Sequence, residues 1–252
     1  MIEASRDYVC VRPQTYENAA ELEVLSYVFS VRGELQNTSF ALLDPDGEKL
    51  TRGARSPSMT FGDADGLARA MRSTYAGYAA KAKPIEALPV VRDLRLGLNV
   101  AAADMRPLVV VRAGTGADAR ELASEVARVA WSTSVVGACH YVVLEGEQAF
   151  GGLSPEPGVT VVQPDPYGRG GEVLTHVDRE AASSPALASS IDRGVGAFSA
   201  EARRHDEHVR EARRRGISWE TETPVTDSHA KDRPRRRPDG RGPRGRRDRR
   251  DG

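Results

Sequence analysis

The sequence predicts an α/β protein built on mixed β-sheets and followed by a basic C-terminal segment. Three observations lead to this prediction. From residue 106 onward, short apolar runs typical of strands alternate with amphipathic segments typical of helices. A strand–turn–strand order near residue 40 returns near residue 158. The 252 residues carry 36 basic and 36 acidic side chains, but the two signs are concentrated in different parts of the chain.

The first block opens with a predicted strand at residues 7–12, DYVCVR, where β-branched and aromatic side chains predominate. Pro13 ends this run. Asn18 then begins a predicted helix, because it is a favourable N-cap and Glu21, three residues later, completes a capping box. Apolar side chains at helical spacing carry this helix to Phe29.

A predicted hairpin and a second helix complete the first block. Residues 40–43 and 48–52 are predicted to be strands, joined by the turn DPDG at 44–47. Asp63 or Asp65 is expected to start the next helix, because aspartate is a favourable N-cap.

A pair of prolines, Pro84 and Pro89, marks the boundary to a second block. Residues 90–105 are predicted to form a helix. Residues 106–114, RPLVVVRAG, are predicted to form a strand, because a continuous valine run suits burial on both faces of a sheet. Asp118 is expected to cap the helix that follows.

The rest of the second block is predicted to be a strand, a hairpin and a closing helix. The strands are placed at 140–146, 158–168 and 170–177, and the helix at 184–205. The hairpin repeats the order of residues 40–52, so the two blocks are interpreted as two copies of one fold. This order implies a mixed sheet with helices on its faces.

Both blocks resemble the thioredoxin-like superfamily. Residues 40–52, FALLDPDGEKLTR, are similar to the strand–turn–strand segment in the family's C-terminal half, and residues 106–177 resemble a domain from its first core strand to its closing hairpin. The resemblance implies two tandem domains. The first, at 1–83, is partial because it lacks the opening strand and helix, and the second spans 84–200.

The resemblance also indicates where the family carries its redox chemistry. A Cys-x-x-Cys motif begins the helix after the first core strand, where the helix terminus lowers the pKa of a thiol. Counting along the second block, that position is occupied by Gly116, Ala117, Asp118 and Ala119. No thiol is present there.

A second feature of the family is a cis-proline just before the first strand of the hairpin, next to the dithiol. Thr38 takes this place in the first block and Val159 in the second. Without the cysteines and the prolines, thiol–disulfide exchange by the usual mechanism is not expected.

The two cysteines of the chain, Cys10 and Cys139, are the remaining candidate thiols. Both lie in or beside predicted strands, where a free cysteine is usually a small buried apolar side chain. His140 follows Cys139 directly, but neighbours in a strand point to opposite faces, so the two are not expected to form a dyad. A disulfide between the cysteines stays open, although reducing conditions disfavour it. Two cysteines exclude a disulfide scaffold, and no cofactor is predicted.

Histidines and glycines supply two further candidate sites. His205 and His208 share one face of a charged predicted helix at 201–215, a spacing that suits two metal ligands. No third ligand stands at a recognisable spacing, so a solvated helix is the simpler interpretation. Gly114 and Gly116 follow a strand and precede a helix, where backbone amides can bind an anion, but the sequence has neither a P-loop nor a dinucleotide fingerprint.

Residues 216–252 are predicted to be a disordered tail. Residues 231–252 hold 11 basic and 4 acidic side chains, whereas residues 1–201 hold 19 and 26. Residues 231–252 have no apolar side chain beyond proline to bury. Their arginines suit bidentate contact with phosphates. The candidate nucleic-acid-binding residues are Arg235, Arg236, Arg237, Arg241, Arg244, Arg246, Arg247, Arg249 and Arg250.

The expected function is that of a non-catalytic thioredoxin-like protein that binds a protein partner or itself. The start of the chain lacks the basic and apolar stretches of a signal peptide, and no apolar run reaches the roughly 18 residues of a membrane span, so the cytoplasm is expected. Two alternatives stay open: an oxidoreductase that uses Cys10 or Cys139 as a lone thiol, and weak binding of RNA or DNA through the tail.

Overall fold

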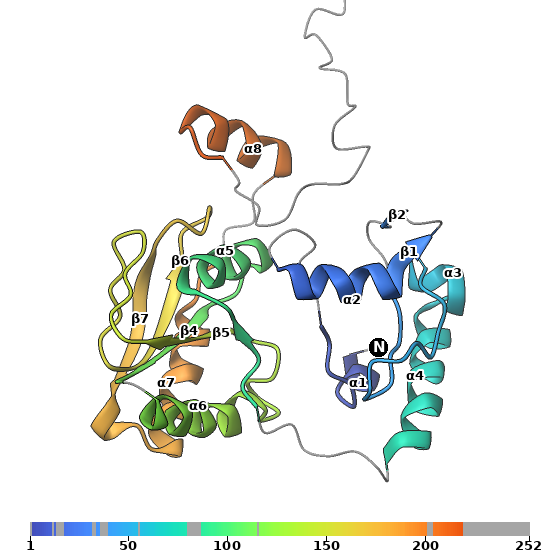
Figure 1. The fold of residues 1–252 in the computed structure, drawn as a ribbon, viewed down its shortest axis with the longest axis horizontal. Helices are drawn as coiled ribbons and strands as arrows, with labels where there is room; N and C mark the ends of the chain where they lie inside the picture. The colour runs from blue at the N-terminus through green and yellow to red at the C-terminus, as the bar shows by residue number, and fades with distance from the viewer. Residues whose placement is uncertain are drawn as a thin grey trace, which may run out of the picture. The chain divides into compact units, whose positions relative to one another are not determined.

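The computed structural model describes residues 2–11, 13, 18–31, 34–35, 40–54, 56–79, 87–114, 116–200 and 204–218 (Figure 1). These residues divide into two compact units. One contains residues 11–70, and the other contains residues 2–10 and 71–218. The division falls inside the helix α4 (Ala64–Tyr78) rather than near residue 84.

The second unit is built on a five-stranded mixed sheet, which confirms the α/β class. Its strands are β3 (Val90–Val91), β4 (Leu108–Ala113), β5 (His140–Glu145), β6 (Gly158–Pro164) and β7 (Gly171–Asp178), in the order β3-β5-β4-β6-β7. The strands β3, β5 and β4 are parallel, whereas β6 is antiparallel to β4 and β7 is antiparallel to β6.

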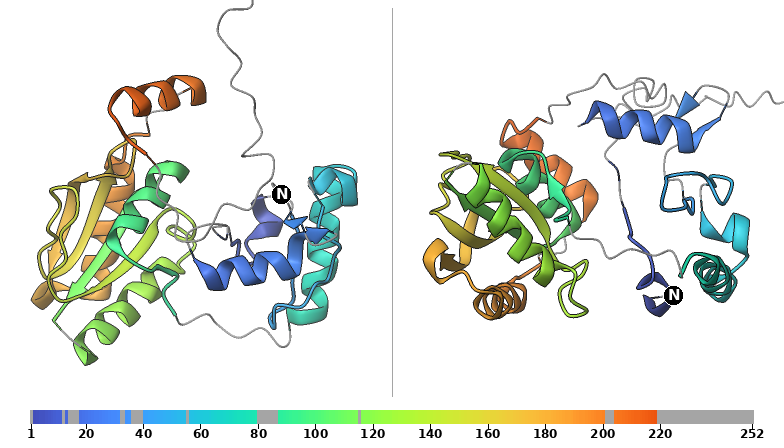
Figure 2. Two further views of the ribbon diagram at one scale, coloured as in Figure 1. Left: turned by 45° about the horizontal axis from the view of Figure 1, so that its top comes forward. Right: turned by 60° about the horizontal axis from the view of Figure 1, so that its bottom comes forward.

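Helices cover both faces of this sheet (Figures 1 and 2). One face packs against α5 (Leu94–Asp104). The other face packs against α6 (Ala117–Ala130) and α7 (Ser184–Ala197). A short 3-10 helix, η2 (Arg179–Ala181), precedes α7. Because α5 precedes β4 and α6 follows it, the chain changes from one face of the sheet to the other at β4. The carboxyl end of β4 is therefore the switch point of the sheet, where open α/β folds commonly bind ligands.

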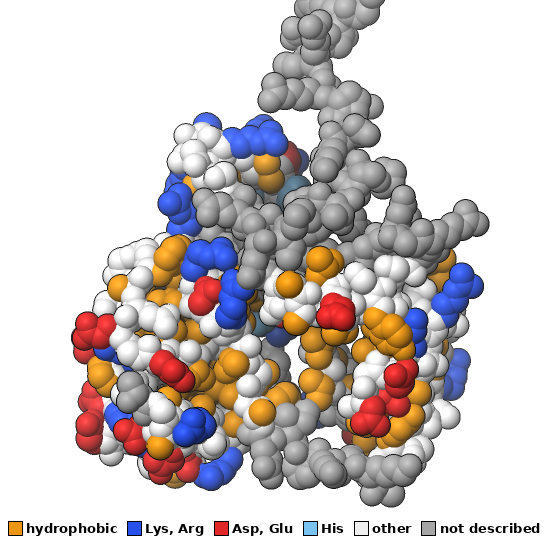
Figure 3. Space-filling view, viewed as in Figure 1, with side chains coloured by type: hydrophobic (Ala, Val, Ile, Leu, Met, Phe, Trp, Pro, Cys, Tyr) orange, Lys and Arg blue, Asp and Glu red, His pale blue; other side chains and the backbone are white. Residues whose placement is uncertain are grey.

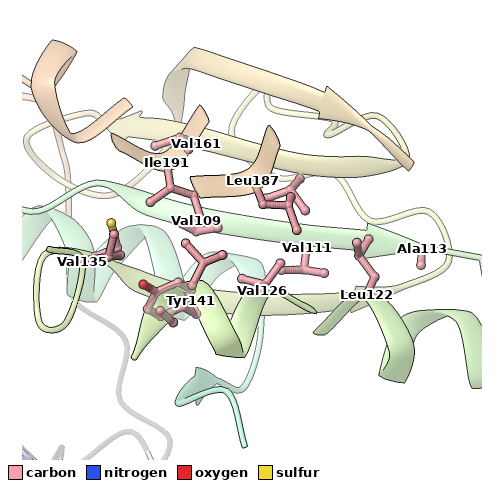
Figure 4. Packing of buried hydrophobic residues seen from close by; sticks show 14 of the residues in the cluster. Val109, Val111, Ala113, Leu122, Val126, Val135, Tyr141, Val161, Leu187 and Ile191 are labelled. Atoms are coloured by element: carbon pink, nitrogen blue, oxygen red, sulfur yellow. The ribbon is translucent and has the colours of Figure 1, made fainter. Parts of the chain in front are cut away.

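Alternate side chains of the central strands fill the two apolar layers. On the α6 and α7 face, Val109 and Val111 of β4 pack with Leu122, Leu187 and Ile191, all of them fully buried (Figure 4). The opposite layer joins β4, β5 and β6 to α5. Its fully buried leucines and valines are Leu98, Leu108, Val110, Val142, Leu144 and Val162. A strand that is buried on both faces has a continuous run of apolar residues in its sequence. For this reason the sequence alone predicted the strand at residues 106–114.

A glycine allows α7 to lie close to the sheet. A Cβ atom added at Gly194 would lie 2.5 Å from Cγ1 and 2.7 Å from Cβ of Val161 on β6. By contrast, Gly196 has nothing within 4 Å of the same position. The interruption of the helical pattern at Gly194 therefore reflects close packing of α7 on β6.

Several bounds in the second unit differ from the sequence-based expectations. The closing helix predicted at 184–205 ends at Ala197, and the strand predicted at 158–168 ends at Pro164. The predicted helix at 90–105 is shorter, because Val90 and Val91 pair with β5 as a strand and Asp93 caps α5 through a bond from the Leu96 amide of 2.8 Å. The N-cap of α6 is Gly116 and not Asp118, which lies in the first turn.

The described part of the first unit is mainly helical. Its elements are α2 (Ala19–Phe29), β1 (Ser30–Val31), β2 (Glu34–Leu35), α3 (Pro57–Phe61) and the start of α4. Asn18 caps α2 as predicted, since its Oδ1 accepts from the Ala20 and Glu21 amides. At the start of α4, Asp63 is the aspartate that caps, because its Oδ1 accepts from the Gly66 amide at 2.6 Å.

Strands predicted in the first block are not formed in the described residues. Residues 8–11 have no strand partner, and Val9 and Val11 are 51% and 73% exposed; a short helix α1 (Ile2–Ser5) precedes them. The turn at 44–47 is present, since the Gly47 amide donates to the Asp44 carbonyl at 3.0 Å. Its flanks meet only in isolated bridges, at Phe40–Ala54 and Leu43–Lys49. The described residues of this unit therefore hold no counterpart of the five-stranded sheet.

The last described element is α8 (His205–Arg214), which ends in a Schellman motif at Gly216. The Ile217 amide donates to the Ala212 carbonyl, and the Gly216 amide donates to the Arg213 carbonyl. Among the helices of the described residues, none has the length and apolar character that crossing a membrane requires.

Candidate functional site

The residues that the resemblance indicates lie at the switch point of the sheet. Gly116, at a φ of 64°, is the N-cap of α6 at the carboxyl end of β4. Ala119 is buried, and Asp118 lies in the first turn of α6. A Cβ atom added at Gly114 would lie 3.9 Å from Oδ2 of Asp118. The described residues of this turn offer backbone amides and one carboxylate, but no thiol.

The position at which the resemblance implies a cis-proline has ordinary strand geometry. Val159 lies within β6, opposite Val111 of β4, and is fully buried. The peptide bonds of the described residues are all trans. Thr38, the equivalent position in the first block, lies outside the described residues.

Cys139 is buried directly before β5, in the apolar layer that faces α6 and α7. Burial raises the pKa of its thiol to about 11, against smaller opposing influences from a hydrogen bond with Tyr141 and from the positive charge of Arg106. The side chain is therefore a neutral thiol near pH 7, whereas nucleophilic chemistry needs the thiolate.

The other groups around Cys139 do not activate it. His140 belongs to the opposite face, where its Nε2 lies 3.0 Å from Oδ2 of Asp104 on α5. Cys10 is exposed, and both cysteines are free, so no disulfide joins them. Of the two candidate lone thiols, Cys10 is the accessible one.

The two histidines of α8 do not form a metal site with other described residues. Within these residues, no group of three histidine, cysteine, aspartate or glutamate side chains could hold a metal ion. His208 instead stacks on Tyr167, with ring centroids 4.4 Å apart. The arginines of the tail from Arg235 to Arg250 lie outside the described residues.

A hydroxyl–imidazole–carboxylate chain on β6 and β7 was not predicted. Thr160 Oγ1 lies 2.8 Å from Nδ1 of His176, and His176 Nε2 lies 3.2 Å from Oδ1 of Asp178. The three types match a nucleophile, base and orienting acid, but Thr160 is only 2% exposed and its hydroxyl is closed to a substrate. These hydrogen bonds therefore act as a polar contact between the two strands. The register of β6 against β7, and not the spacing of the three residues in the sequence, brings Thr160, His176 and Asp178 together.

Arg112 is a second candidate functional residue that the sequence analysis did not single out. It interrupts the apolar run of β4, and its guanidinium donates to the Pro155 carbonyl and lies 3.6 Å from Oε1 of Glu147. Since Glu147 is 94% exposed, this ion pair contributes little to stability. The Pro155 contact instead ties β4 to the loop that leads into β6.

Comparison of the chain with protein-family models, curated proteins and solved structures finds no match in any of the three.

Proposed function

We propose that the chain is a non-catalytic binding module in which residues 84–200 form a thioredoxin-like domain without a redox centre. The strand order β3-β5-β4-β6-β7 supports this proposal, because it combines a central parallel strand and its following helix with a closing antiparallel hairpin and a final helix. These are the parts on which the resemblance of the sequence rests.

The observation that carries the proposal is the character of the carboxyl end of β4. The turn from Gly116 to Ala119 presents no thiol, and Cys139, which precedes β5 at the opposite end of the sheet, is held neutral in the core. Thiolate chemistry at this end of the sheet would need a group that the described residues do not supply there. Binding, in contrast, needs only a rigid scaffold with an accessible surface.

The edge of the sheet supports assembly with a protein partner or a second copy. Among the described strands, β7 pairs with β6 alone, so its other edge offers backbone donors and acceptors over eight residues. Val173, in this strand, is 54% exposed. An unpaired strand edge is a template for strand addition.

The redox part of the proposal is tested by reduction of insulin with dithiothreitol. We expect no turnover above background. Turnover that disappears in Cys10→Ser or in Cys139→Ser would instead support the lone-thiol oxidoreductase.

The assembly part is tested by sedimentation equilibrium of the chain alone, and by chemical cross-linking to partners in the presence of cell extract. The variant Val173→Lys places a charge on the β7 edge and should lower association, whereas Val136→Lys, at a loop valine that is 46% exposed, should not. If both variants associate as strongly as the wild-type protein does, the role of β7 is contradicted.

A further inference from the structure

The helix α2 of the first unit is more apolar than its packing within that unit requires. Apart from Glu21, Glu23 and Ser26, its 11 residues are apolar or aromatic. A helix that is apolar on most of its sides is normally buried on most of its sides. In α2, however, Leu25 and Val28 alone are buried, and their spacing places them on one side of the helix.

The exposed side of α2 carries two large side chains one turn apart. Val24 is 50% exposed and Tyr27 is 51% exposed, and residues three apart in a helix lie on the same face. Exposed apolar side chains that gather on one face mark interaction surfaces, whereas those scattered singly do not. This side of α2 is therefore a candidate docking surface.

The segment after the DPDG turn packs against Tyr27. The Tyr27 hydroxyl donates to Oε2 of Glu48 at 2.7 Å. Nζ of Lys49 donates to the Tyr27 carbonyl at 3.1 Å and lies 4.5 Å from the centroid of the ring. Leu50, the next residue, is 38% exposed and adds to the apolar surface. We call Val24, Tyr27 and Leu50 the α2 patch.

Negative charge predominates around the α2 patch. Residues 18–31 hold two acidic and no basic side chains, and residues 40–54 hold three acidic and two basic side chains. Of the acidic residues, Glu23, Asp46 and Glu48 are exposed. Hydrophobic and acidic side chains lie next to each other over α2 in Figure 3. The surface is thus apolar at its centre and negative at its margin.

We propose that the α2 patch docks a segment of a partner protein in which basic residues flank a large apolar side chain. The apolar side chain packs on Val24, Tyr27 and Leu50, and the basic residues pair with the carboxylates at the margin. A symmetric contact between two copies would bring the same acidic residues together, so charge disfavours a second copy as the occupant. This inference rests on the binding function proposed above and names a surface and a partner chemistry for it.

The test is selection of short random peptides displayed on phage against the full-length protein, followed by fluorescence anisotropy with the selected peptides. We expect sequences in which arginine or lysine flanks leucine, phenylalanine or another large apolar residue. Selection of acidic or purely polar peptides, or of no peptide at all, would overturn the proposal.

Variants of the patch locate the bound peptide. Val24→Lys and Tyr27→Ala, both at exposed positions, should each weaken binding about tenfold, the effect of one well-packed contact residue. Tyr27→Phe keeps the ring and should keep the affinity. Val136→Lys, at the exposed loop valine of the second unit, is the matched control.

The same assay separates this inference from the broader binding function. Undiminished binding by both Val24→Lys and Tyr27→Ala would overturn the role of the α2 patch. If the selected peptides instead lose affinity in Val173→Lys, the chain is still a binding module, but its docking surface is the β7 edge.

Two charge variants should have opposite effects. Asp46→Asn removes a negative charge at the margin and should weaken peptide binding by up to about fivefold, the size of one exposed ion pair. Lys49→Gln removes a positive charge beside Tyr27 and should strengthen binding by a similar factor. Both differences should shrink at high salt. A change in the same direction in the two variants, or no change in either, would overturn the role of charge.

The basic C-terminal segment of the chain is the competing occupant. A synthetic peptide of residues 231–252 carries 11 basic and 4 acidic side chains, but no apolar side chain beyond proline. It should therefore fail to displace a selected peptide at equal concentration. Displacement at equal concentration would assign the α2 patch to the chain's own tail and overturn the proposal.

Discussion

Two glycines of α7 respond in opposite ways to the same substitution. Gly194 faces β6, where an added Cβ would lie 2.5 Å from Cγ1 and 2.7 Å from Cβ of Val161. Gly196, two residues later in the same helix, is exposed and has nothing within 4 Å of the added atom. Gly194→Ala should therefore destabilise the protein, whereas Gly196→Ala should stabilise it.

The magnitudes follow from two opposing contributions. Alanine is favoured over glycine inside a helix by about 0.5–1 kcal/mol, and both variants gain this. Only Gly194→Ala meets a rigid β-branched neighbour on a central strand, and overpacking of this kind costs about 1–3 kcal/mol. Because the helical gain is common to both, the difference in the free energy of unfolding between the two variants isolates the overpacking cost, about 1–3 kcal/mol.

The assay is urea unfolding followed by circular dichroism at 222 nm, with the two variants measured beside the wild type. In a thermal melt of the same proteins, each kcal/mol of this difference should shift Tm by about 2–4 °C, given the length of the chain. The slope of the free energy against urea should stay the same in all three proteins, since the surface exposed on unfolding is unchanged. Equal stability of the two variants would show that α7 does not pack on β6 as described.

Three more predictions concern the core and the switch point. The pKa of Cys139 is raised from 9.0 to about 11, so the folded chain keeps a proton that the unfolded chain loses. The free energy of unfolding should fall as the pH rises from 9 to 11, and urea titrations of Cys139→Ala should show a shallower fall. Tyr141→Phe should change the free energy of unfolding by less than about 1 kcal/mol, because among the described residues the buried hydroxyl interacts only with the Cys139 thiol, which is a weak hydrogen-bonding group; a loss of more than about 1 kcal/mol in the same titrations would contradict this. Gly116→Cys combined with Ala119→Cys should form an internal disulfide detectable by mass, and its reduced form should show, by absorbance at 240 nm, a thiol pKa below about 8.5; an ordinary thiol pKa would contradict the placement of this turn at the start of α6.

Sequence periodicity located the second unit well, for reasons that its packing explains. The valine run of β4 is apolar on both sides because helices cover both faces of the sheet, and this produces a pattern that depends on few other residues. The helix α6 alternates buried Leu122 and Val126 with exposed charged residues at helical spacing. The β6–β7 hairpin was visible because its turn residues carry their own conformational preference.

The same reasoning failed where an element depends on a distant partner. The β-branched residues at 7–12 suit a strand, yet Val9 and Val11 remain exposed, because propensity cannot supply a neighbouring strand. Conversely, Val90 and Val91 continue into a helical pattern, and only their pairing with β5, about 50 residues later, makes them a strand.

By itself, the sequence determined the α/β class, the bounds of the strongly periodic elements, the absence of a dithiol at Gly116–Ala119 and the concentration of positive charge at the C-terminus. These properties depend on residues that are near one another in the chain. The tertiary structure alone decided the strand order, the burial that keeps Cys139 neutral and the meeting of Tyr167 with His208 and Arg215. Each of these depends on contacts between residues far apart in sequence, and such contacts follow from how the apolar faces of helices and strands pack together rather than from local preference.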